Sequence, residues 1–218
     1  MKRQILILLA VLLVVCAVGC GNNNAEKAVP KSFEDAESVR QYLLSQNAEY
    51  VKNGKNAGDI SAKKRADTSA NGQQPYAVIV TCSDSRVPAE HIFNAGIGEL
   101  FVIRTAGNVI GEYELGSVEY GAEHLGTKLV VVLGHTNCGA VDAALNGGAH
   151  GNIKAITDEI LSCLPEKCDA REAEQLNVEN SIRKIMDSEI MQKLAKSGET
   201  TVLGAIYDIE SGKVDFLN

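Results

Sequence analysis

The sequence predicts an α/β fold in which a mostly parallel central sheet is flanked by helices. Continuous runs of apolar, β-branched residues are typical of strands buried on both faces, and they occur at 76–81, 100–103, 128–133 and 201–207. Segments with helical spacing separate several of these runs, and strands that alternate with helices form parallel sheets. A short last strand is expected at 213–217. The composition, with 45% hydrophobic residues, is that of a globular domain.

The first residues predict an export signal. A basic head, Lys2 and Arg3, precedes an uncharged apolar run over 5–18, and small residues follow up to Cys20. This arrangement is typical of a secretory signal, and the run is shorter than the roughly 18 apolar residues of a spanning helix. A cysteine after small residues resembles the bacterial lipobox, so we expect residues 1–19 to be removed and Cys20 to carry lipid. A cleaved soluble export signal and an uncleaved anchor are the alternatives.

The expected lipid would hold the rest of the chain at a membrane surface. We expect a flexible polar tether over 20–31, followed by one α/β domain over 32–218. A diacyl anchor on Cys20 would place this domain at the outer face of the bacterial cytoplasmic membrane, or at an outer membrane where one exists. The chain has 21 basic and 28 acidic residues and a formal net charge of −7, which argues against a sequence-independent nucleic-acid binder.

The expected helices lie around these strands. The first spans about 33–53, with Ser32 as its cap and Asn53-Gly54 as its stop. Residues 54–75 are polar and rich in glycine and asparagine, which predicts mostly loop. Further helices are expected over 88–94, opened by a proline in the first turn, and over 113–125.

Chemically reactive side chains are concentrated where two of the strands end. Cys-Ser-Asp-Ser-Arg follows the first strand at 82–86, and Gly-His-Thr-Asn-Cys-Gly follows the third at 134–139. Functional sites of such sheets lie at the carboxyl ends of the strands, so we expect Cys82, His135 and Cys138 to converge. Two thiols and one imidazole suit zinc, and three protein ligands leave a fourth position for water, as in catalytic sites.

Asp84 and Arg86 are expected to act beside this zinc. Asp84 lies two residues beyond Cys82, where its carboxylate could bind either the metal or the Arg86 guanidinium. Zinc lowers the pKa of bound water towards about 7, which makes a hydroxide nucleophile available near neutrality. Because two thiolates weaken this acidification, we expect the Asp84–Arg86 pair to matter. Asp84 would accept the hydroxide proton and orient its lone pair.

Other zinc and cysteine chemistries fit these loops less well. A structural zinc site usually has four Cys or His ligands, and no fourth one lies nearby in the sequence. A cysteine phosphatase would use Cys82 and Arg86, but Asp84 inside this short loop would repel phosphate. The chain has no Cys-x-x-Cys, which excludes thioredoxin-type redox chemistry and zinc deamination.

The paired motifs closely resemble those of the β-class carbonic anhydrases. Cys-Ser-Asp-Ser-Arg and the later His-x-x-Cys-Gly carry the resemblance, which extends from about Phe33 to the C-terminus and includes the closing segment 204–214. It implies one zinc ion per chain and the reversible hydration of carbon dioxide to bicarbonate and a proton. The metal ligands that it implies are Cys82, His135, Cys138 and, in a closed form, Asp84.

The resemblance also implies a substrate pocket and an assembly. It implies a homodimer, or a tetramer built from dimers, in which Gln73 faces the metal of the other subunit and the helix over 33–51 wraps the partner. Gln73 would donate a hydrogen bond to an oxygen of carbon dioxide or bicarbonate. The residues expected in the pocket are Gln73, Phe101, Ala106, Tyr120 and Gly139. Some members carry a tryptophan in a non-catalytic bicarbonate site where this chain has Ile79, so we favour the form in which Asp84 binds Arg86.

Some residues and functions are left open by the sequence. Cys163 and Cys168 either close a small disulfide loop or remain two free thiols. No residue is identified as a proton shuttle. Two alternative functions are a relative that acts on another small substrate, such as carbon disulfide, and a non-enzymatic zinc-bearing surface lipoprotein.

Overall fold

The computed structural model describes residue 30 and residues 32–217. The expected signal over 1–19, the lipid-bearing Cys20 and nearly all of the tether over 20–31 lie outside the described residues, so these remain predictions. Within the described part of the chain, none of the helices combines the length and the apolar character needed to cross a membrane.

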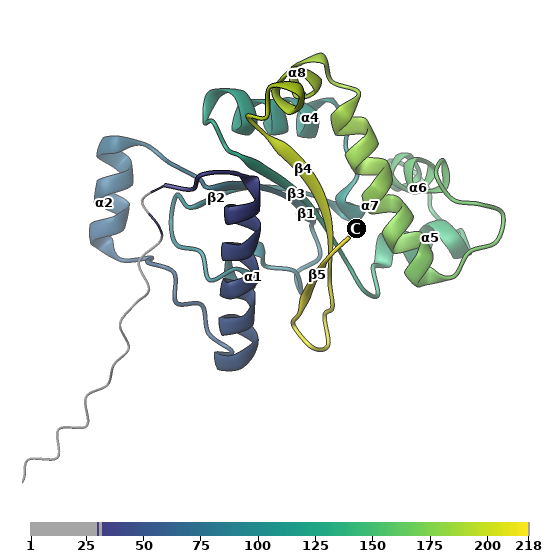
Figure 1. Ribbon diagram of the computed structural model, residues 1–218. Helices are drawn as coiled ribbons and strands as arrows, with labels where there is room; N and C mark the ends of the chain where they lie inside the picture. Colours follow the sequence, from purple (N-terminus) through teal and green to yellow (C-terminus); the bar gives the residue numbers. More distant parts are fainter. Residues whose placement is uncertain (1–29, 31, 218) are drawn as a thin grey trace, which may run out of the picture.

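A five-stranded sheet forms the centre of the domain (Figure 1). Its strands are β1 (Ala77–Cys82), β2 (Leu100–Thr105), β3 (Leu129–His135), β4 (Thr201–Tyr207) and β5 (Val214–Phe216), in the order β2-β1-β3-β4-β5. The first four strands pair in parallel and β5 pairs antiparallel with β4, which confirms the predicted mostly parallel sheet. Every residue of β1 and β3 is buried, as expected of central strands covered on both faces.

Helices flank the sheet on both sides (Figure 1). They are α1 (Ala36–Asn53), α2 (Ala62–Asn71), α3 (Ala89–Ile92), α4 (Glu112–Glu119), α5 (Gly139–Asn146), α6 (Ile153–Leu161), α7 (Ala170–Met186) and α8 (Glu189–Ser197). A π-helical turn over Tyr120–His124 continues α4, so the two together match the helix expected over 113–125. The helix expected over 88–94 is the shorter α3, which Pro88 precedes as its cap residue.

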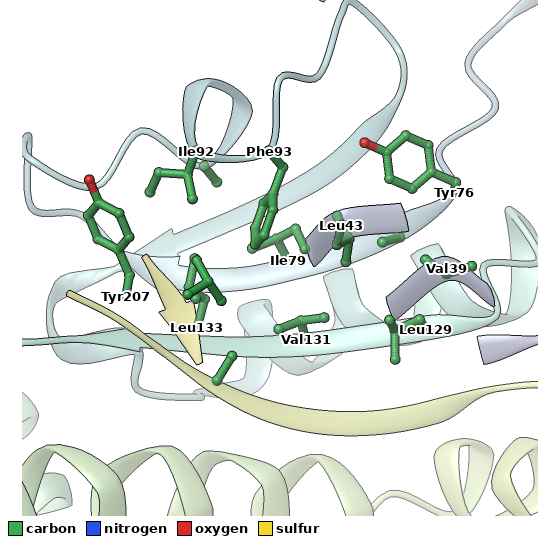
Figure 2. Close-up of a cluster of buried hydrophobic side chains, with 14 of the residues drawn as sticks. Val39, Leu43, Tyr76, Ile79, Ile92, Phe93, Leu129, Val131, Leu133 and Tyr207 are labelled. Carbon is green, nitrogen blue, oxygen red and sulfur yellow. The ribbon is translucent and has the colours of Figure 1, made fainter. Parts of the chain in front are cut away.

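Alternate residues of the central strands build one hydrophobic core on each face. Ile79 of β1 belongs to the same core as Leu43 of α1 and Phe93 (Figure 2). Val80, the next residue of β1, belongs to the opposite core together with Val178 of α7. This alternation follows from the period of two of a strand. The helices α1 and α7 therefore cover opposite faces of the same strands.

The apolar face of α1 is used within its own chain. Val39 and Leu43 of this helix are 1% and 0% exposed and lie in the core over the sheet. Asn47 accepts a hydrogen bond from the N–H of Val214 at 3.0 Å and donates one to the carbonyl of Gly212 at 2.9 Å. The apolar side of this helix therefore packs on the chain's own sheet, and the expected wrapping of a partner subunit by the rest of the helix stays a prediction.

The start of α1 and the segment after it differ from the prediction. Asp35, not Ser32, caps α1: its carboxylate accepts from the N–H of Ser38 at 2.8 Å, and the Ser38 hydroxyl accepts from the Asp35 N–H at 3.2 Å. The expected loop over 54–75 contains α2, none of whose residues is buried in the described chain. Because α2 has no apolar stripe, periodicity could not reveal it.

Gly134, the residue before His135 on β3, has no space for a side chain. A Cβ atom there would lie 2.5 Å from Cγ2 of Val178 and 3.1 Å from Cδ1 of Ile206. Since the core must shift to admit it, we expect Gly134→Ala to lower the free energy of unfolding by about 1–3 kcal/mol. Chemical denaturation measures this change.

Gly116→Ala is the matched control for this prediction. Gly116 lies in α4, and an added Cβ would meet no heavy atom within 4 Å in the described part of the chain. Alanine restricts the unfolded chain and is favoured in helices, so this variant should gain about 0.4–1 kcal/mol. Equal effects of the two substitutions would contradict the steric explanation.

Candidate metal centre

β1 and β3 end beside each other and bring three metal-ligating side chains together. Cys82 is the last residue of β1, His135 is the last residue of β3, and Cys138 follows immediately before α5. All three are buried, and one ligand atom from each lies within 4.8 Å of the others. Zinc binds sulfur at about 2.3 Å and nitrogen at about 2.0–2.1 Å, so one tetrahedral ion can reach all three.

The hydrogen bonding of His135 fits a zinc ligand. Its Nδ1 lies 2.9 Å from the carbonyl oxygen of Thr136, which assigns the proton to that nitrogen. Its Nε2 is buried and has no hydrogen-bond partner among the residues that the structure describes. A buried nitrogen lone pair beside two sulfur atoms would be costly without a partner. A zinc ion held by this histidine and the two cysteines would be the partner of the Nε2 lone pair, because zinc prefers sulfur and imidazole ligands.

A shared hydrogen bond shifts the pKa values of the two cysteine thiols in opposite directions. A hydrogen bond with Cys138 lowers the pKa of Cys82 to about 4. The Cys82 sulfur also accepts from the N–H of Gly107 at 3.2 Å and from the N–H of Asp84 at 3.4 Å. The same pairing, together with burial, raises the pKa of Cys138. The centre therefore favours a thiolate at Cys82, and the thiolate is the form of cysteine that binds metal.

Asp84 and Arg86 form a two-point ion pair next to the sulfur atoms. Arg86 donates from Nε to Oδ1 of Asp84 at 3.0 Å and from Nη2 to Oδ2 at 2.7 Å. Its Nη2 also donates to the carbonyl of Asn137 at 3.0 Å, in the loop between His135 and Cys138. These bonds lower the pKa of Asp84 to about 2, so the carboxylate is charged at neutral pH. In this structure Asp84 binds Arg86, and its role as a fourth ligand in a closed form stays a prediction.

Arg104 holds the segment over 82–86 in place through hydrogen bonds, a role that the sequence did not reveal. It lies opposite Thr81 in the register of β1 and β2. Its Nε donates to the carbonyl of Cys82 at 3.1 Å, and its Nη2 donates to the carbonyl of Asp84 at 2.8 Å. Only the pairing of the two strands brings this guanidinium to the loop.

Comparison with known proteins identifies the family. Residues 77–214, well over half of the chain, match the sequence profile of the family described as carbonic anhydrase. The chain belongs to the carbonic anhydrase family. Carbonic anhydrase 2 of Mycobacterium tuberculosis is 40% identical over 165 residues, which cover 70% of this chain and 79% of that protein. The carbonic anhydrase of Mycolicibacterium smegmatis is 35% identical over 164 residues, with the same coverage of 70% and 79%.

Solved structures place this carbonic anhydrase in the β class. The β-carbonic anhydrase CafA of Aspergillus fumigatus superposes with a TM-score of 0.64 at 26% identity, covering 84% of this chain and 90% of that chain. A chain from the crystal structures of two tetrameric β-carbonic anhydrases of Sordaria macrospora superposes with a TM-score of 0.62 at 27% identity. The match covers 83% of this chain and 97% of that chain. The predicted β-class resemblance is confirmed, and with it zinc as the metal.

Ala106 and Gly139 lie at the metal centre of this carbonic anhydrase. Ala106 opens a 3-10 turn over Ala106–Asn108, and the next residue, Gly107, donates to the Cys82 sulfur. Gly139 begins α5 directly after Cys138. Both backbone segments therefore lie next to the metal ligands, where a substrate pocket is expected.

Gln73, Phe101 and Tyr120 lie at the other end of the sheet. Gln73 is exposed and precedes β1, whereas the metal ligand Cys82 ends it. Phe101 lies in register with the second residue of β1, and its ring centroid is 5.9 Å from that of Tyr120. A strand rises about 3.3 Å per residue, so the two ends of β1 are roughly 17 Å apart. Within one chain these three residues do not line the metal centre.

The other two cysteines among the residues that the structure describes are free thiols. Cys163 and Cys168 are both partly exposed and unbonded, so the disulfide considered as one alternative is not formed in this structure. The Cys163 thiol donates to the carbonyl of Ile160 at 3.1 Å. Burial raises the pKa of the Cys163 thiol, which keeps it in the less reactive protonated form.

Proposed function

We propose that this carbonic anhydrase hydrates carbon dioxide reversibly to bicarbonate and a proton. The observation that carries the proposal is the buried Cys2His group with an arginine-bound carboxylate beside it. When bound, zinc would act as a Lewis acid and make water reactive near neutrality. The remaining tasks fall to residues of the chain itself.

Asp84 has the task of orienting the reacting water. Arg86 lowers the pKa of Asp84 to about 2, so this carboxylate is a weak base and a permanent hydrogen-bond acceptor at neutral pH. It can hold a hydrogen of the water without removing it, which directs an oxygen lone pair at carbon dioxide. The two bonds to Arg86 fix the direction of the carboxylate, because a two-point pair resists rotation.

We infer that a second copy of the chain completes the substrate pocket. Gln73, Phe101 and Tyr120 lie away from their own metal centre, and Tyr120 is 47% exposed despite its aromatic ring. The β-carbonic anhydrases of Sordaria macrospora are tetramers. In a homodimer or a dimer-based tetramer, these residues would face the metal of the other subunit, where Gln73 donates to a substrate oxygen.

We propose further that the enzyme acts outside the cytoplasm, anchored through lipid on Cys20. Support comes from the basic head, the uncharged apolar run and the small residues before this cysteine. Mass spectrometry of protein extracted from membranes should find a chain that begins at a lipid-modified Cys20. The Cys20→Ala variant should lack the lipid. An intact Met1 or an unmodified Cys20 in the wild type would contradict the anchor.

Stopped-flow carbon dioxide hydration tests the activity. We expect a rate above that of buffer that rises with zinc content up to one ion per chain. Dipicolinate, a zinc chelator, should abolish the rate, and added zinc but not magnesium should restore it, because the sulfur ligands disfavour magnesium. A protein with one zinc per chain and no rate above buffer would overturn the proposal. Carbon disulfide hydrolysis by that protein would then identify the other substrate.

A further inference from the structure

A stripe of buried polar side chains on α7 contacts the segments around the metal centre. Glu174, Asn177 and Ser181 are 5%, 1% and 1% exposed. Their spacing of three and four residues places them on one face of the helix. Buried polar side chains cost free energy unless they form hydrogen bonds, so the groups that they bind indicate why they are there.

Glu174 holds the loop that carries one sulfur ligand. Its Oε1 accepts a hydrogen bond from the backbone N–H of Cys138 at 3.2 Å. Arg171 lies 3.8 Å from the other carboxylate oxygen and is the cation that faces it. The bond to the backbone of a metal ligand fixes where the loop enters α5.

Asn177 holds the segment that donates to the other sulfur ligand. Its Nδ2 donates to the carbonyl of Gly107 at 2.7 Å, and the N–H of Gly107 donates to the Cys82 sulfur at 3.2 Å. One turn further along α7, the Ser181 hydroxyl donates to the carbonyl of Asn108 at 2.9 Å. Both sulfur ligands, one at the end of β1 and one immediately before α5, are therefore connected to a single helix.

The segment held by Asn177 and Ser181 needs such support. Gly107 and Asn108 both have positive φ angles, of 67° and 48°. Glycine adopts this left-handed conformation freely and asparagine at a small cost, so the hydrogen bonds to α7 help to select this conformation of the segment. Without its bonds to α7 the segment would relax, and the N–H of Gly107 would turn away from the sulfur.

We propose that the polar stripe of α7 positions the two sulfur ligands and tunes their donor strength, an inference that rests on the zinc assignment in the proposed function. A hydrogen bond to a metal-bound thiolate withdraws electron density from the sulfur. The outer groups that orient metal ligands commonly change metal affinity by 10- to 100-fold. Glu174, Asn177 and Ser181 are thus positioning residues: they act through the loops and do not touch the metal or the substrate.

The first test compares Asn177→Leu with a matched control on the same helix. Asn180 is 8% exposed, and its side chain bonds Glu159 at 2.8 Å and Arg183 at 3.0 Å instead of either metal-binding loop. Zinc release from the full chain to an excess of a chromophoric chelator is measured for both variants. We expect release about 10- to 100-fold faster from Asn177→Leu and within about twofold of wild type from Asn180→Leu. Equal release from the two variants would overturn the proposal.

Cobalt substitution gives a second readout that a purely structural role would not move. The sulfur-to-cobalt charge-transfer band should shift to longer wavelength in Asn177→Leu, because the Cys82 sulfur loses its N–H donor. The band of Asn180→Leu should match that of the wild type. A band in Asn177→Leu at the wild-type wavelength would show that the segment does not tune the sulfur.

Glu174 is tested by a pair of substitutions that separates its hydrogen bond from its charge. Glu174→Gln keeps an oxygen acceptor for Cys138, whereas Glu174→Leu removes it. We expect zinc release near the wild-type rate from the first and faster release from the second. Equally fast release from both would overturn the role of the hydrogen bond.

Ser181→Ala is the alternative test variant in case Asn177→Leu does not fold. Loss of its single hydrogen bond should speed zinc release by roughly two- to tenfold. Release at the wild-type rate would overturn the part of the proposal that concerns this serine.

Carbon dioxide hydration is measured separately on the zinc-loaded wild type. If the wild type holds zinc but does not hydrate carbon dioxide, the proposed function is wrong, but the zinc-release comparison remains valid.

Discussion

Replacement of Cys138 by serine is expected to reduce carbon dioxide hydration to the uncatalysed rate. Cys138 is one of the three buried ligands whose atoms lie within 4.8 Å of one another. A serine hydroxyl stays protonated at neutral pH and is a harder donor than a thiolate, so the remaining Cys82 and His135 hold zinc weakly. The purified variant should contain much less than one zinc per chain. Metal analysis and stopped-flow hydration measure the two effects together.

Cys163→Ser is the matched control for this prediction. Cys163 is a partly exposed free thiol outside the ligand group. The same chemical change there should leave both zinc content and hydration rate at their wild-type values. A Cys138→Ser protein that kept full zinc and full activity would show that the ligand assignment is wrong.

Asp84→Asn should lose activity while it keeps zinc. Asparagine retains the shape of the side chain but presents an amide N–H₂ in place of one carboxylate oxygen, and it leaves Arg86 without a negatively charged partner. Positioned acid–base groups contribute about 10²- to 10⁴-fold to rates, and we expect a fall of that order in kcat/KM. Because the change lies outside the three ligands, zinc content should remain one ion per chain.

Asp158→Asn controls for the loss of an ion-paired carboxylate. Asp158 pairs with Lys154 on the exposed side of α6, where both side chains are more than half exposed. Exposed ion pairs of this kind contribute little to stability, so the hydration rate of Asp158→Asn should equal that of the wild type. Full activity in Asp84→Asn, or an equal loss in both variants, would contradict the orienting role.

The shifted pKa of Asp84 also predicts how this ion pair responds to acid. Arg86 lowers the pKa of the carboxyl from its ordinary 3.8 to about 2. The folded state therefore gains stability from the charged carboxylate at pH values above 3.8, and this gain is lost as pH falls through about 2. Any loss of activity between pH 5 and 7 is accordingly not expected to come from protonation of Asp84.

The strands and the metal ligands could be predicted because their signals are local. β1 and β3 are continuous apolar runs, and Cys82 and His135 end those strands. Parallel strands place such residues at a shared edge, so the convergence with Cys138 followed from the order of elements alone. The exposed helix α2 was missed for the opposite reason: none of its residues is buried in the described chain, so it carries no apolar period.

The groups that support the ligands could not be predicted in this way. Arg104 reaches the carbonyls of Cys82 and Asp84 only because β2 pairs with β1 in a particular register. Glu174 reaches the N–H of Cys138, and Asn177 reaches the turn whose N–H donates to the Cys82 sulfur. Both contacts arise only because α7 packs on β3 and β4, far along the chain from either segment. Neither contact leaves a motif in the sequence.

The sequence by itself determined the family, the fold class and the three residues that converge on zinc, because these depend on strand periodicity and on short motifs. The tertiary structure alone decided which side chains hold those ligands and which end of the sheet each expected pocket residue occupies. Gln73, Phe101 and Tyr120 lie a strand length from their own metal centre, whereas Ala106 and Gly139 border it. Hydrogen bonds between distant segments depend on register and helix packing, and these are properties of the whole fold.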